Sequence, residues 1–441
     1  MKAWLRTYGC RANQADSEQL RAALVARGVT LVHEARDADV AIFNSCAVTG
    51  EAEADLRQGV RRAARERTGL ESVVMGCAAA LDRGTIAALP GVRAVVAGGD
   101  VAGVLAALAL PAEPHAGGAP VAMPQSGARA LLRIQDGCAE HCTFCATTLA
   151  RGAHRSRDAR TIVAEARALA TWHPEIVLTG THIGHYGHEC HSSLGALVGR
   201  LVREVPGVRF RLTSVEATEV DARLAALLRG DTGGPVRVTP HLHAPLQSGS
   251  ESVLRRMGRH WYTARTYAGA VERLVDGRPV FALGGDLIAG FPGETDADHR
   301  ATVALVESLP FTYLHVFPYS ARPGTAATRL GAPVPPPEVA SRAAELRAIG
   351  ERRAAAYIAS RAGGVADVVV TGAGRERRGL TEDYLSVSLA DPTLPRRARL
   401  SARLTLGAAD RLEAAALASV VPDASAAAGT LPLSALDPAH A

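Results

Sequence analysis

Short apolar runs alternate with amphipathic stretches along most of the chain, and this pattern predicts strands that are followed by helices. Near the N-terminus it predicts buried strands at 2–8, 39–45 and 72–76, with helices at 17–28 and 51–67 between them. Ser17 and Glu51 provide side chains suited to helix starts. Strands that alternate with helices favour a parallel α/β sheet, which we assign to a first domain at residues 1–109.

A segment rich in Pro, Gly and Ala, residues 110–128, is predicted to be a linker to a second domain at residues 129–355. There the alternation resumes with six strand candidates, at 130–135, 175–180, 209–216, 236–249, 281–294 and 311–320. Helices are predicted between them, at 159–172, 193–205, 220–229, 262–277 and 296–309. Six such units predict a partial (β/α)6 barrel, with the active site at the ends of the strands.

The last part of the chain changes character after the proline-rich stretch PVPPPEV. A helix is predicted at 340–364, and short strands follow at 365–374, 377–391 and 397–407. We assign residues 356–412 to a small β-rich module, and we expect the Ala-, Ser- and Pro-rich residues 413–441 to be a disordered tail.

The composition restricts the class of protein and its expected cellular location. Of 441 residues, 47% are hydrophobic and 21% are charged, which is typical of a globular protein, and the net charge of +5 permits an anionic partner without requiring one. The sequence contains no apolar run of the ~18 residues that a membrane helix needs, and its start lacks the apolar stretch of a secretion signal. We therefore expect a cytoplasmic protein whose seven cysteines are metal ligands, catalytic thiols or core residues rather than disulfides.

Three of these cysteines, Cys138, Cys142 and Cys145, lie close together in RIQDGCAEHCTFCATTLARG, with the spacing CxxxCxxC. Zinc sites prefer paired ligands, so three thiols without a fourth partner fit zinc poorly. A cubane 4Fe–4S cluster offers four ligand positions, and three thiolates leave one iron open for a substrate or cofactor. A zinc knuckle that uses His141 or His154 is the alternative.

A second set, Cys10, Cys46 and Cys77, is dispersed in the sequence, but each cysteine ends a predicted strand of the first domain. The ends of parallel strands point the same way, so the three thiols can converge at one edge of the sheet. Gly9 and Gly76 precede two of them and allow close approach of the backbone. Three unrelated buried cysteines are the alternative. We interpret this set as the ligands of a second cluster with an open iron.

The core cysteine spacing, directly after the first strand of the barrel run, resembles the radical S-adenosylmethionine (SAM) superfamily. With the second set, the chain resembles the methylthiotransferase family, which has an N-terminal α/β domain, a radical SAM core and a C-terminal β domain called TRAM. The motifs that carry the resemblance span the chain to about residue 410: YGCRANQADSEQL, RIQDGCAEHCTFC, ARGAHRSR, EIVLTGTHIGHYG, RLTSVEATEV, HLHAPLQSGSESVLRRMGR, DLIAGFPGET and YLHVFPYSARPGT.

The resemblance implies that SAM serves both as methyl donor and as radical source, and that a purine C–H is replaced by C–S–CH₃. It implies that Cys138, Cys142 and Cys145 hold the 4Fe–4S cluster that cleaves SAM, and that Cys10, Cys46 and Cys77 hold an auxiliary 4Fe–4S cluster. Phe144 occupies the aromatic position between the last two core cysteines. Candidate SAM contacts are Thr179, Gly180, Ser214, Glu216 and Gln247.

The implied partners are a tRNA anticodon loop and a reduced flavodoxin- or ferredoxin-type electron donor, and the chain is expected to act as a monomer. Arg151, Arg155 and Arg157 follow the cluster loop and are candidate RNA contacts, because the planar guanidinium suits phosphate. The β module is expected to add RNA affinity, without taking part in the chemistry, through Arg396, Arg397 and Arg399.

Several choices stay open from the sequence. HLHAPLQSGS, LHVFPYS and GLTEDYLSV most resemble the branch that modifies threonylcarbamoyladenosine in tRNA, whereas other members modify isopentenyladenosine or a ribosomal protein. A non-catalytic, metal-containing RNA-binding protein is a further alternative. The loop sequence departs from the family at Thr147, Thr148 and His188–Cys190, and Cys190 is interpreted as a spare thiol. His241 and His243 are interpreted as residues that line the barrel.

Overall fold

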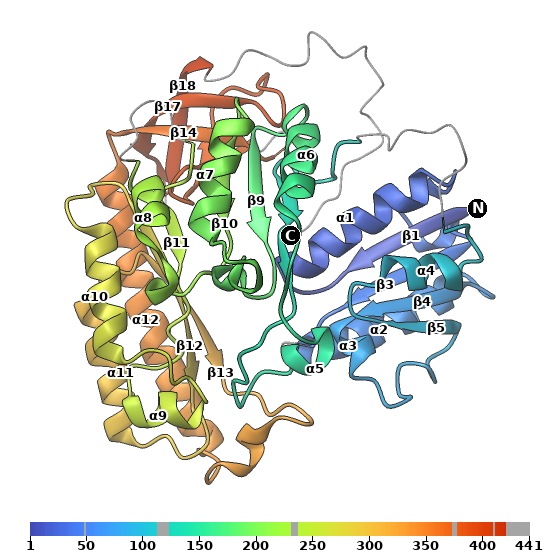
Figure 1. Ribbon diagram of the computed structural model, residues 1–441, viewed down its shortest axis with the longest axis horizontal. Coiled ribbons are helices and arrows are strands. Elements are labelled where there is room, and N and C mark those ends of the chain that lie inside the picture. Colours follow the sequence, from blue (N-terminus) through green and yellow to red (C-terminus); the bar gives the residue numbers. More distant parts are fainter. Residues whose placement is uncertain (48–49, 113–122, 231–236, 373–376, 409–410, 420–441) are drawn as a thin grey trace.

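The computed structural model describes three connected regions of the chain, which Figure 1 shows as an N-terminal α/β domain, a central core and a C-terminal β barrel. The described residues are 1–47, 50–112, 123–230, 237–372, 377–408 and 411–419. Among the helices of these residues, we find none with the length and apolar character needed to cross a membrane.

The N-terminal domain is a five-stranded sheet in which every neighbouring pair is parallel, in the order β2-β1-β3-β4-β5. Its strands are β1 (Lys2–Thr7), β2 (Thr30–Leu31), β3 (Val40–Ser45), β4 (Glu71–Gly76) and β5 (Val92–Ala97). Its helices are α1 (Arg11–Val25), α2 (Gly50–Glu66), α3 (Cys77–Ala80) and α4 (Val101–Ala107). Alternate residues of β3 pack on opposite sides: Phe43 joins α2 and α3, whereas Ile42 joins α1 and α4.

Two features of this domain differ from the prediction. Helix α1 begins at Arg11 rather than at Ser17, whose hydroxyl is buried and bonds to Thr7 Oγ1 instead of capping a helix. The two-residue edge strand β2 and the apolar strand β5 also belong to the sheet, although neither was predicted. The predicted parallel α/β class is confirmed.

The core contains six parallel strands in two sheets, with the orders β10-β9-β6 and β11-β12-β13, and parallel bridges from Phe210 to Val238 and from Ser214 to His243 join them. The strands are β6 (Ala130–Arg133), β9 (Glu175–Thr179), β10 (Arg209–Leu212), β11 (His241–His243), β12 (Ala282–Ala289) and β13 (Tyr313–Pro318). The helices are α5 (Thr147–Arg151), α6 (Ala159–Ala170), α7 (Leu194–Glu204), α8 (Ala222–Arg229), α9 (Glu251–Arg256), α10 (Ala264–Val275), α11 (Asp296–Ser308) and α12 (Pro336–Arg361). The six strands therefore lie in chain order, as predicted.

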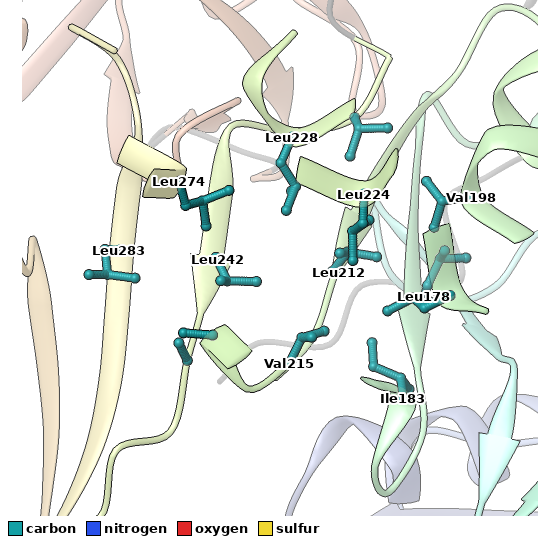
Figure 2. Close-up of a cluster of buried hydrophobic side chains, with 14 of the residues drawn as sticks. Leu178, Ile183, Val198, Leu212, Val215, Leu224, Leu228, Leu242, Leu274 and Leu283 are labelled. Atoms are coloured by element: carbon teal, nitrogen blue, oxygen red, sulfur yellow. The ribbon is translucent and has the colours of Figure 1, made fainter. Parts of the chain in front are cut away.

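One face of these strands packs against the helices and the other does not. Figure 2 shows buried leucines of neighbouring strands, Leu212, Leu242 and Leu283 among them, packed against Leu224 of α8 and Leu274 of α10. Because side chains alternate along a strand, the residues directly before and after each of these strand leucines point to the opposite, inner face. That inner face carries polar side chains, including Arg211, His243 and Asp286.

The C-terminal region is a closed barrel in the order β14-β15-β16-β18-β17. Its strands are β14 (Val365–Val370), β15 (Arg378–Thr381), β16 (Ser386–Leu389), β17 (Arg399–Leu406) and β18 (Leu412–Ser419). The predicted boundaries need correction at both ends. Helix α12 continues to Arg361, so the barrel begins after it, and residues 413–419 complete the barrel rather than starting a tail. The rest of the predicted tail, 420–441, lies outside the described residues, as does most of the predicted linker (113–122).

Candidate metal and cofactor site

The auxiliary thiols follow three adjacent strands of the N-terminal sheet. Cys10 comes after β1, Cys46 follows β3 directly, and Cys77 follows β4 and starts α3. The strand order reverses between β1 and β3, and in open α/β sheets ligands bind outside the carboxyl ends of the strands at such a switch point. The auxiliary thiols therefore occupy the position at which this topology builds a ligand site.

Asn13 and Gly9 show how closely these thiols converge. Asn13 Oδ1 lies 3.4 Å from Cys10 Sγ and 3.9 Å from Cys77 Sγ, and its Nδ2 donates to Ser45 O at the end of β3. A Cβ added to Gly9, which has φ +95°, would lie 2.5 Å from Cys46 Sγ, so only glycine allows this approach. The predicted convergence of the three thiols is confirmed, and their role as cluster ligands remains a prediction.

The core thiols lie on one loop between β7 (Gln135–Asp136) and α5. The loop leaves the strand through Gly137, whose φ is +71° and whose added Cβ would lie 2.0 Å from Ala153 O. The two residues that depart from the family pattern brace this loop. Thr147 donates from its backbone N–H to Cys145 Sγ (3.4 Å), and the Thr148 hydroxyl donates to Glu140 O (3.1 Å).

Burial raises the pKa of Cys77 and of Cys142 to about 11 and that of Cys138 to about 12, so these thiols are protonated at neutral pH and would have to lose a proton to bind a metal. Thiolates on one tetrahedral zinc ion lie about 3.8 Å apart, given Zn–S bonds of about 2.3 Å. Among the described residues, every potential ligand trio with all atoms within 4.8 Å of one another lacks cysteine. In each thiol set, at least one pair of sulfur atoms is therefore more than 4.8 Å apart, which is wider than the spacing on one zinc ion.

The structure corrects the prediction for Arg151. Its side chain is 2% exposed and lies between the two thiol sets rather than on an RNA-facing surface. Nε donates to Cys77 Sγ (3.2 Å), Nη2 donates to Asp16 (2.7 Å) and to Asn13 Oδ1 (3.0 Å), and Nη1 donates to Asp136 (3.0 Å). The prediction that Arg151 contacts RNA is therefore wrong, because every nitrogen of its guanidinium already has a partner.

The other predicted RNA contacts differ in how accessible they are. Arg155 is exposed on β8 (Arg155–Ser156), whereas Arg157 is partly exposed and donates to Glu165 (2.7 Å). Arg396 and Arg397 donate to backbone carbonyls of residues 125–127, between the N-terminal domain and the core. Arg399 is 4% exposed and pairs with Asp367, so its predicted role in RNA binding is wrong.

The predicted SAM contacts lie at the carboxyl ends of β9, β10 and β11. Thr179 is fully buried, and its Oγ1 has no hydrogen-bond partner among the described residues. A Cβ added to Gly180 would lie 2.6 Å from Gln135 O, so the backbone is tightly packed there. Ser214 is exposed, and Gln247 adopts a left-handed backbone with φ +67°, a strained conformation that is often found at functional sites. Phe144 packs against the apolar cluster that includes Met257 and Phe291.

Glu216 is hydrogen-bonded to two neighbouring side chains, and its contact with SAM remains a prediction. Its two carboxylate oxygens accept from Arg259 Nη2 and from Trp261 Nε1. Arg259 is 6% exposed, and its Nη1 donates to Cys142 Sγ (3.5 Å). Glu216 thus orients an arginine toward a core thiol, and a sequence pattern could not identify this link because Arg259 lies 117 residues after Cys142.

Histidines near the core loop were also missed by the sequence analysis. His182 Nδ1 lies 3.6 Å from Cys138 Sγ, and its Nε2 lies 2.6 Å from Glu219 Oε1. His185 stacks on His182 at a centroid distance of 4.0 Å and also contacts Glu219 (3.1 Å). The repeated histidines of THIGHYGHECH were the available signal. His243, predicted to line the barrel, contacts Asp286 (2.9 Å), and Cys190 is exposed on a short turn.

A cavity of about 400 Å³ opens beside both thiol sets. Its lining includes Ala47, Ala78 and Ala146, which directly follow Cys46, Cys77 and Cys145, together with Arg322 from the loop after β13. Arg322 donates to Ala47 O from Nε (3.1 Å) and Nη2 (2.8 Å), so the core holds the loop that follows Cys46. Residues that follow cysteines of both thiol sets therefore line one cavity, to which the N-terminal domain and the core both contribute.

Comparison with known proteins agrees with this architecture. Residues 2–98 match the uncharacterised protein family UPF0004, and residues 132–306 match the radical SAM superfamily. The radical SAM methyltransferase TsrM from Kitasatospora setae, solved with cobalamin and a [4Fe–4S] cluster bound, shares the fold with a TM-score of 0.55 at 15% identity, over 74% of this chain and 76% of that one.

Two curated relatives cover nearly the whole chain. Threonylcarbamoyladenosine tRNA methylthiotransferase MtaB from Aquifex aeolicus is 31% identical over 88% of this chain and 96% of its own length. The tRNA-2-methylthio-N(6)-dimethylallyladenosine synthase from Sorangium cellulosum is 33% identical over 85% of this chain and 82% of its own. With both domain matches and this coverage, the chain belongs to the methylthiotransferase family of radical SAM enzymes.

Proposed function

We propose that this enzyme adds a methylthio group to C2 of N6-threonylcarbamoyladenosine at position 37 of tRNA. The observation that carries the proposal is the contact between the two parts of the chain that bear the thiols, in which Arg151, from the helix that follows Cys145, donates to Cys77. Sulfur insertion at an unactivated carbon needs a radical source and a sulfur source near the same substrate atom. The contact of Arg151 with Cys77 places the segment after the core thiols against the auxiliary set, as that need requires.

Each thiol set has its own task in this proposal. Cys138, Cys142 and Cys145 hold the cluster that binds SAM, and Cys10, Cys46 and Cys77 hold the auxiliary cluster. When bound, these groups supply the carbon radical, the sulfur and the methyl group.

Arg155 is the residue that we assign to the tRNA backbone. It is exposed, and it lies in the β7–β8 hairpin whose other strand leads into the core thiol loop. A phosphate contact there would hold an anticodon-loop base near the thiol sets, and single-stranded loop bases are accessible to such an enzyme. A cytoplasmic location and a flavodoxin- or ferredoxin-type donor accompany this proposal.

The choice of nucleoside rests on motif resemblance, since the two curated relatives differ in the adenosine that their names specify. The segments HLHAPLQSGS and GLTEDYLSV favour threonylcarbamoyladenosine. Dimethylallyladenosine is the second candidate, because the relative named for that product is equally similar to this chain.

Mass spectrometry of tRNA nucleosides would test the proposal. A strain without the gene should lose 2-methylthio-N6-threonylcarbamoyladenosine and keep its unmodified precursor, and the wild-type gene should restore the product. A Cys142→Ala gene should not restore it, whereas a gene with Cys190→Ala, an exposed cysteine outside both sets, should. Loss of the methylthio derivative of dimethylallyladenosine instead would assign the second candidate. Unchanged tRNA would refute both.

A further inference from the structure

Each thiol set has one buried arginine in contact with one of its sulfurs. Arg151 Nε donates to Cys77 Sγ at 3.2 Å, and Arg259 Nη1 donates to Cys142 Sγ at 3.5 Å. The two arginines are 6% exposed, and they belong to separate hydrogen-bond networks. We propose that Arg151 and Arg259 are a pair of tuning residues, each of which raises the reduction potential of the cluster that its own thiol set holds.

The physical reason is the charge of a cluster held by thiolates. Reduction adds a negative charge to a buried centre that is already anionic, so a nearby guanidinium stabilises the reduced form more than the oxidised form. A hydrogen bond from N–H to the ligand sulfur acts in the same direction, because it draws electron density from the sulfur. Both effects raise the reduction potential.

The surroundings of Arg151 make its effect the larger one. Its guanidinium forms ion pairs with two carboxylates. Nη2 lies 2.7 Å from Asp16 Oδ2, and Nη1 lies 3.0 Å from Asp136 Oδ1; Asp16 is fully buried. If Arg151 loses its charge, Arg133 alone remains to balance both carboxylates, at 2.6 Å from Asp16 and 3.4 Å from Asp136. The auxiliary cluster would then face an uncompensated negative charge as well as a lost hydrogen bond.

Arg259 has a simpler environment. Glu216 accepts from its Nη2, Tyr262 accepts from its Nε (2.7 Å), and its guanidinium lies over the rings of Trp261 and Tyr262 at 5.0 Å. One carboxylate balances one guanidinium in this group. Removing the charge of Arg259 should therefore lower the potential of the core cluster, by less than the loss of Arg151 lowers that of the auxiliary cluster.

Full-length variants that each keep one thiol set allow the two potentials to be measured separately. The auxiliary cluster is titrated in Cys138/Cys142/Cys145→Ala, and the core cluster in Cys10/Cys46/Cys77→Ala, by EPR-monitored redox titration. In the auxiliary background, Arg151→Met should change the one-electron equilibrium at least tenfold toward oxidation, which is a fall of 59 mV. Arg259→Met in that background is the matched control and should leave the potential unchanged. In the variant that keeps only the core set, Arg259→Met should lower the potential of the core cluster. Arg151→Met is the control there and should leave that potential unchanged.

Two milder variants protect the test if Arg151→Met does not bind iron. Arg151→Lys keeps the charge with fewer donors and should give a smaller fall. Asp16→Asn removes a negative charge beside the same arginine and should shift the potential upward. Opposite signs for these two variants support electrostatic tuning, because general loosening of the site would not reverse sign.

This inference rests on the proposed assignment of the thiols to two clusters, and iron and sulfide content separates the two ideas. A wild-type protein that binds only one cluster refutes that assignment. Two fully loaded clusters whose potentials do not move in the arginine variants, or move in the wrong background, refute the tuning role alone.

Discussion

The two thiol sets are built in opposite ways. The core set occupies eight consecutive residues of a single loop, whereas the auxiliary set is gathered from the ends of β1, β3 and β4, across 68 residues of sequence. The core loop is held by Thr147 and Thr148 and also by distant parts of the core, since the Thr143 hydroxyl donates to Arg256 O (2.8 Å) and Arg259 donates to Cys142. The auxiliary set also depends on residues of the core, since Arg151 contacts Cys77 and Arg322 holds the loop after Cys46.

A site built on one loop and a site gathered from several strands should therefore respond differently to substitutions in the rest of the protein. The core loop carries its three thiols on one short segment, so their spacing does not depend on the register of several strands. The auxiliary site depends on the register of three strands and on docking of the N-terminal domain against the core. Any change that loosens that docking should affect the auxiliary thiols first.

The largest expected effects come from removing one ligand of each set. Cys142→Ala should abolish reductive cleavage of SAM, because the core thiols hold the cluster that performs it. Cys46→Ala should keep cleavage but give no methylthio product. Both are measured by chromatography of 5′-deoxyadenosine and of modified tRNA nucleosides after anaerobic reconstitution. Full product from Cys46→Ala would show that the dispersed set is not part of the active site.

Sequence reasoning succeeded where spacing or periodicity carries the information. CxxxCxxC identified the core loop, and cysteines at the ends of predicted strands identified the auxiliary set before any coordinates. It failed where a contact joins distant segments. In the sequence, Arg151 has the charge and the position expected of an RNA contact. In the structure, its side chain is buried and donates to Asp16 and Cys77. The partner of a buried arginine depends on domain docking, which no local pattern records.

Element boundaries failed for a related reason. Strand β18 consists mainly of alanine and has little strand propensity, so its place in the barrel depends on pairing with β17. Helix α1 starts six residues earlier than predicted because Cys10 is at its N-cap, and the polar residues of its first turns are buried against the sheet. Tertiary contacts decided both cases.

Substituting one glycine beside each thiol set should disrupt the two sets separately. Gly9→Ala would bring a Cβ to 2.3 Å from Cys46 Cβ, and Gly137→Ala would bring one to 2.0 Å from Ala153 O. Each should reduce iron content to about half that of wild type, through loss of its own cluster. Iron analysis with EPR would measure this loss.

Matched controls exist for both glycines. Gly28 and Gly277 have φ angles of +75° and +67°, but an added Cβ would meet no atom within 4 Å. Alanine at these positions adds backbone strain without a clash, and both variants should keep the full iron content. Equal losses in the controls would attribute the effect to strain rather than to the close approach at the thiols.

A smaller effect is expected from His173, which holds the segment between the two regions. Its neutral ring accepts from Gln125 N at Nε2 (3.1 Å), and Nδ1 contacts Ala128 O (3.1 Å). Burial, with a further contribution from Arg397, lowers the pKa of His173 to about 4 from an ordinary value of 6.5. The unfolded chain therefore takes up a proton at a higher pH than the folded protein does. The stability contribution is complete above pH 6.5 and is lost as pH falls toward 4.

The size of this contribution is about 3 kcal/mol, from 1.36 kcal/mol per pKa unit. Urea unfolding of the cluster-free protein at pH 7.5 and 5.0 would measure about 2 kcal/mol of it, because pH 5.0 lies about 1.5 units below the ordinary pKa of 6.5. His173→Gln should weaken the dependence of stability on pH, whereas His191→Gln, at an exposed position, should preserve it. An unchanged dependence in His173→Gln would show that this joint does not respond to acid.

The smallest effect concerns the C-terminal barrel, which was expected to bind RNA without influencing the chemistry. Tyr384 of the barrel accepts from Arg11 Nη2 at 2.6 Å, and Arg11 directly follows Cys10. The Tyr384 ring also stacks on His241 of the core at 4.5 Å, so one side chain joins all three regions. Tyr384→Phe keeps the ring and removes one hydrogen bond, which is worth about 1 kcal/mol.

That loss should fall on the auxiliary set alone. In Tyr384→Phe, the auxiliary cluster should be released at a lower urea concentration, while release of the core cluster stays unchanged. Absorbance of each cluster in the single-set backgrounds measures the two midpoints, and Tyr384→Ala should give a larger shift because it also removes the stacking. If both midpoints shift equally, the barrel stabilises the protein as a whole. If neither shifts, the Arg11 contact does not support the Cys10 loop, and the dispersed set depends on the core but not on the barrel.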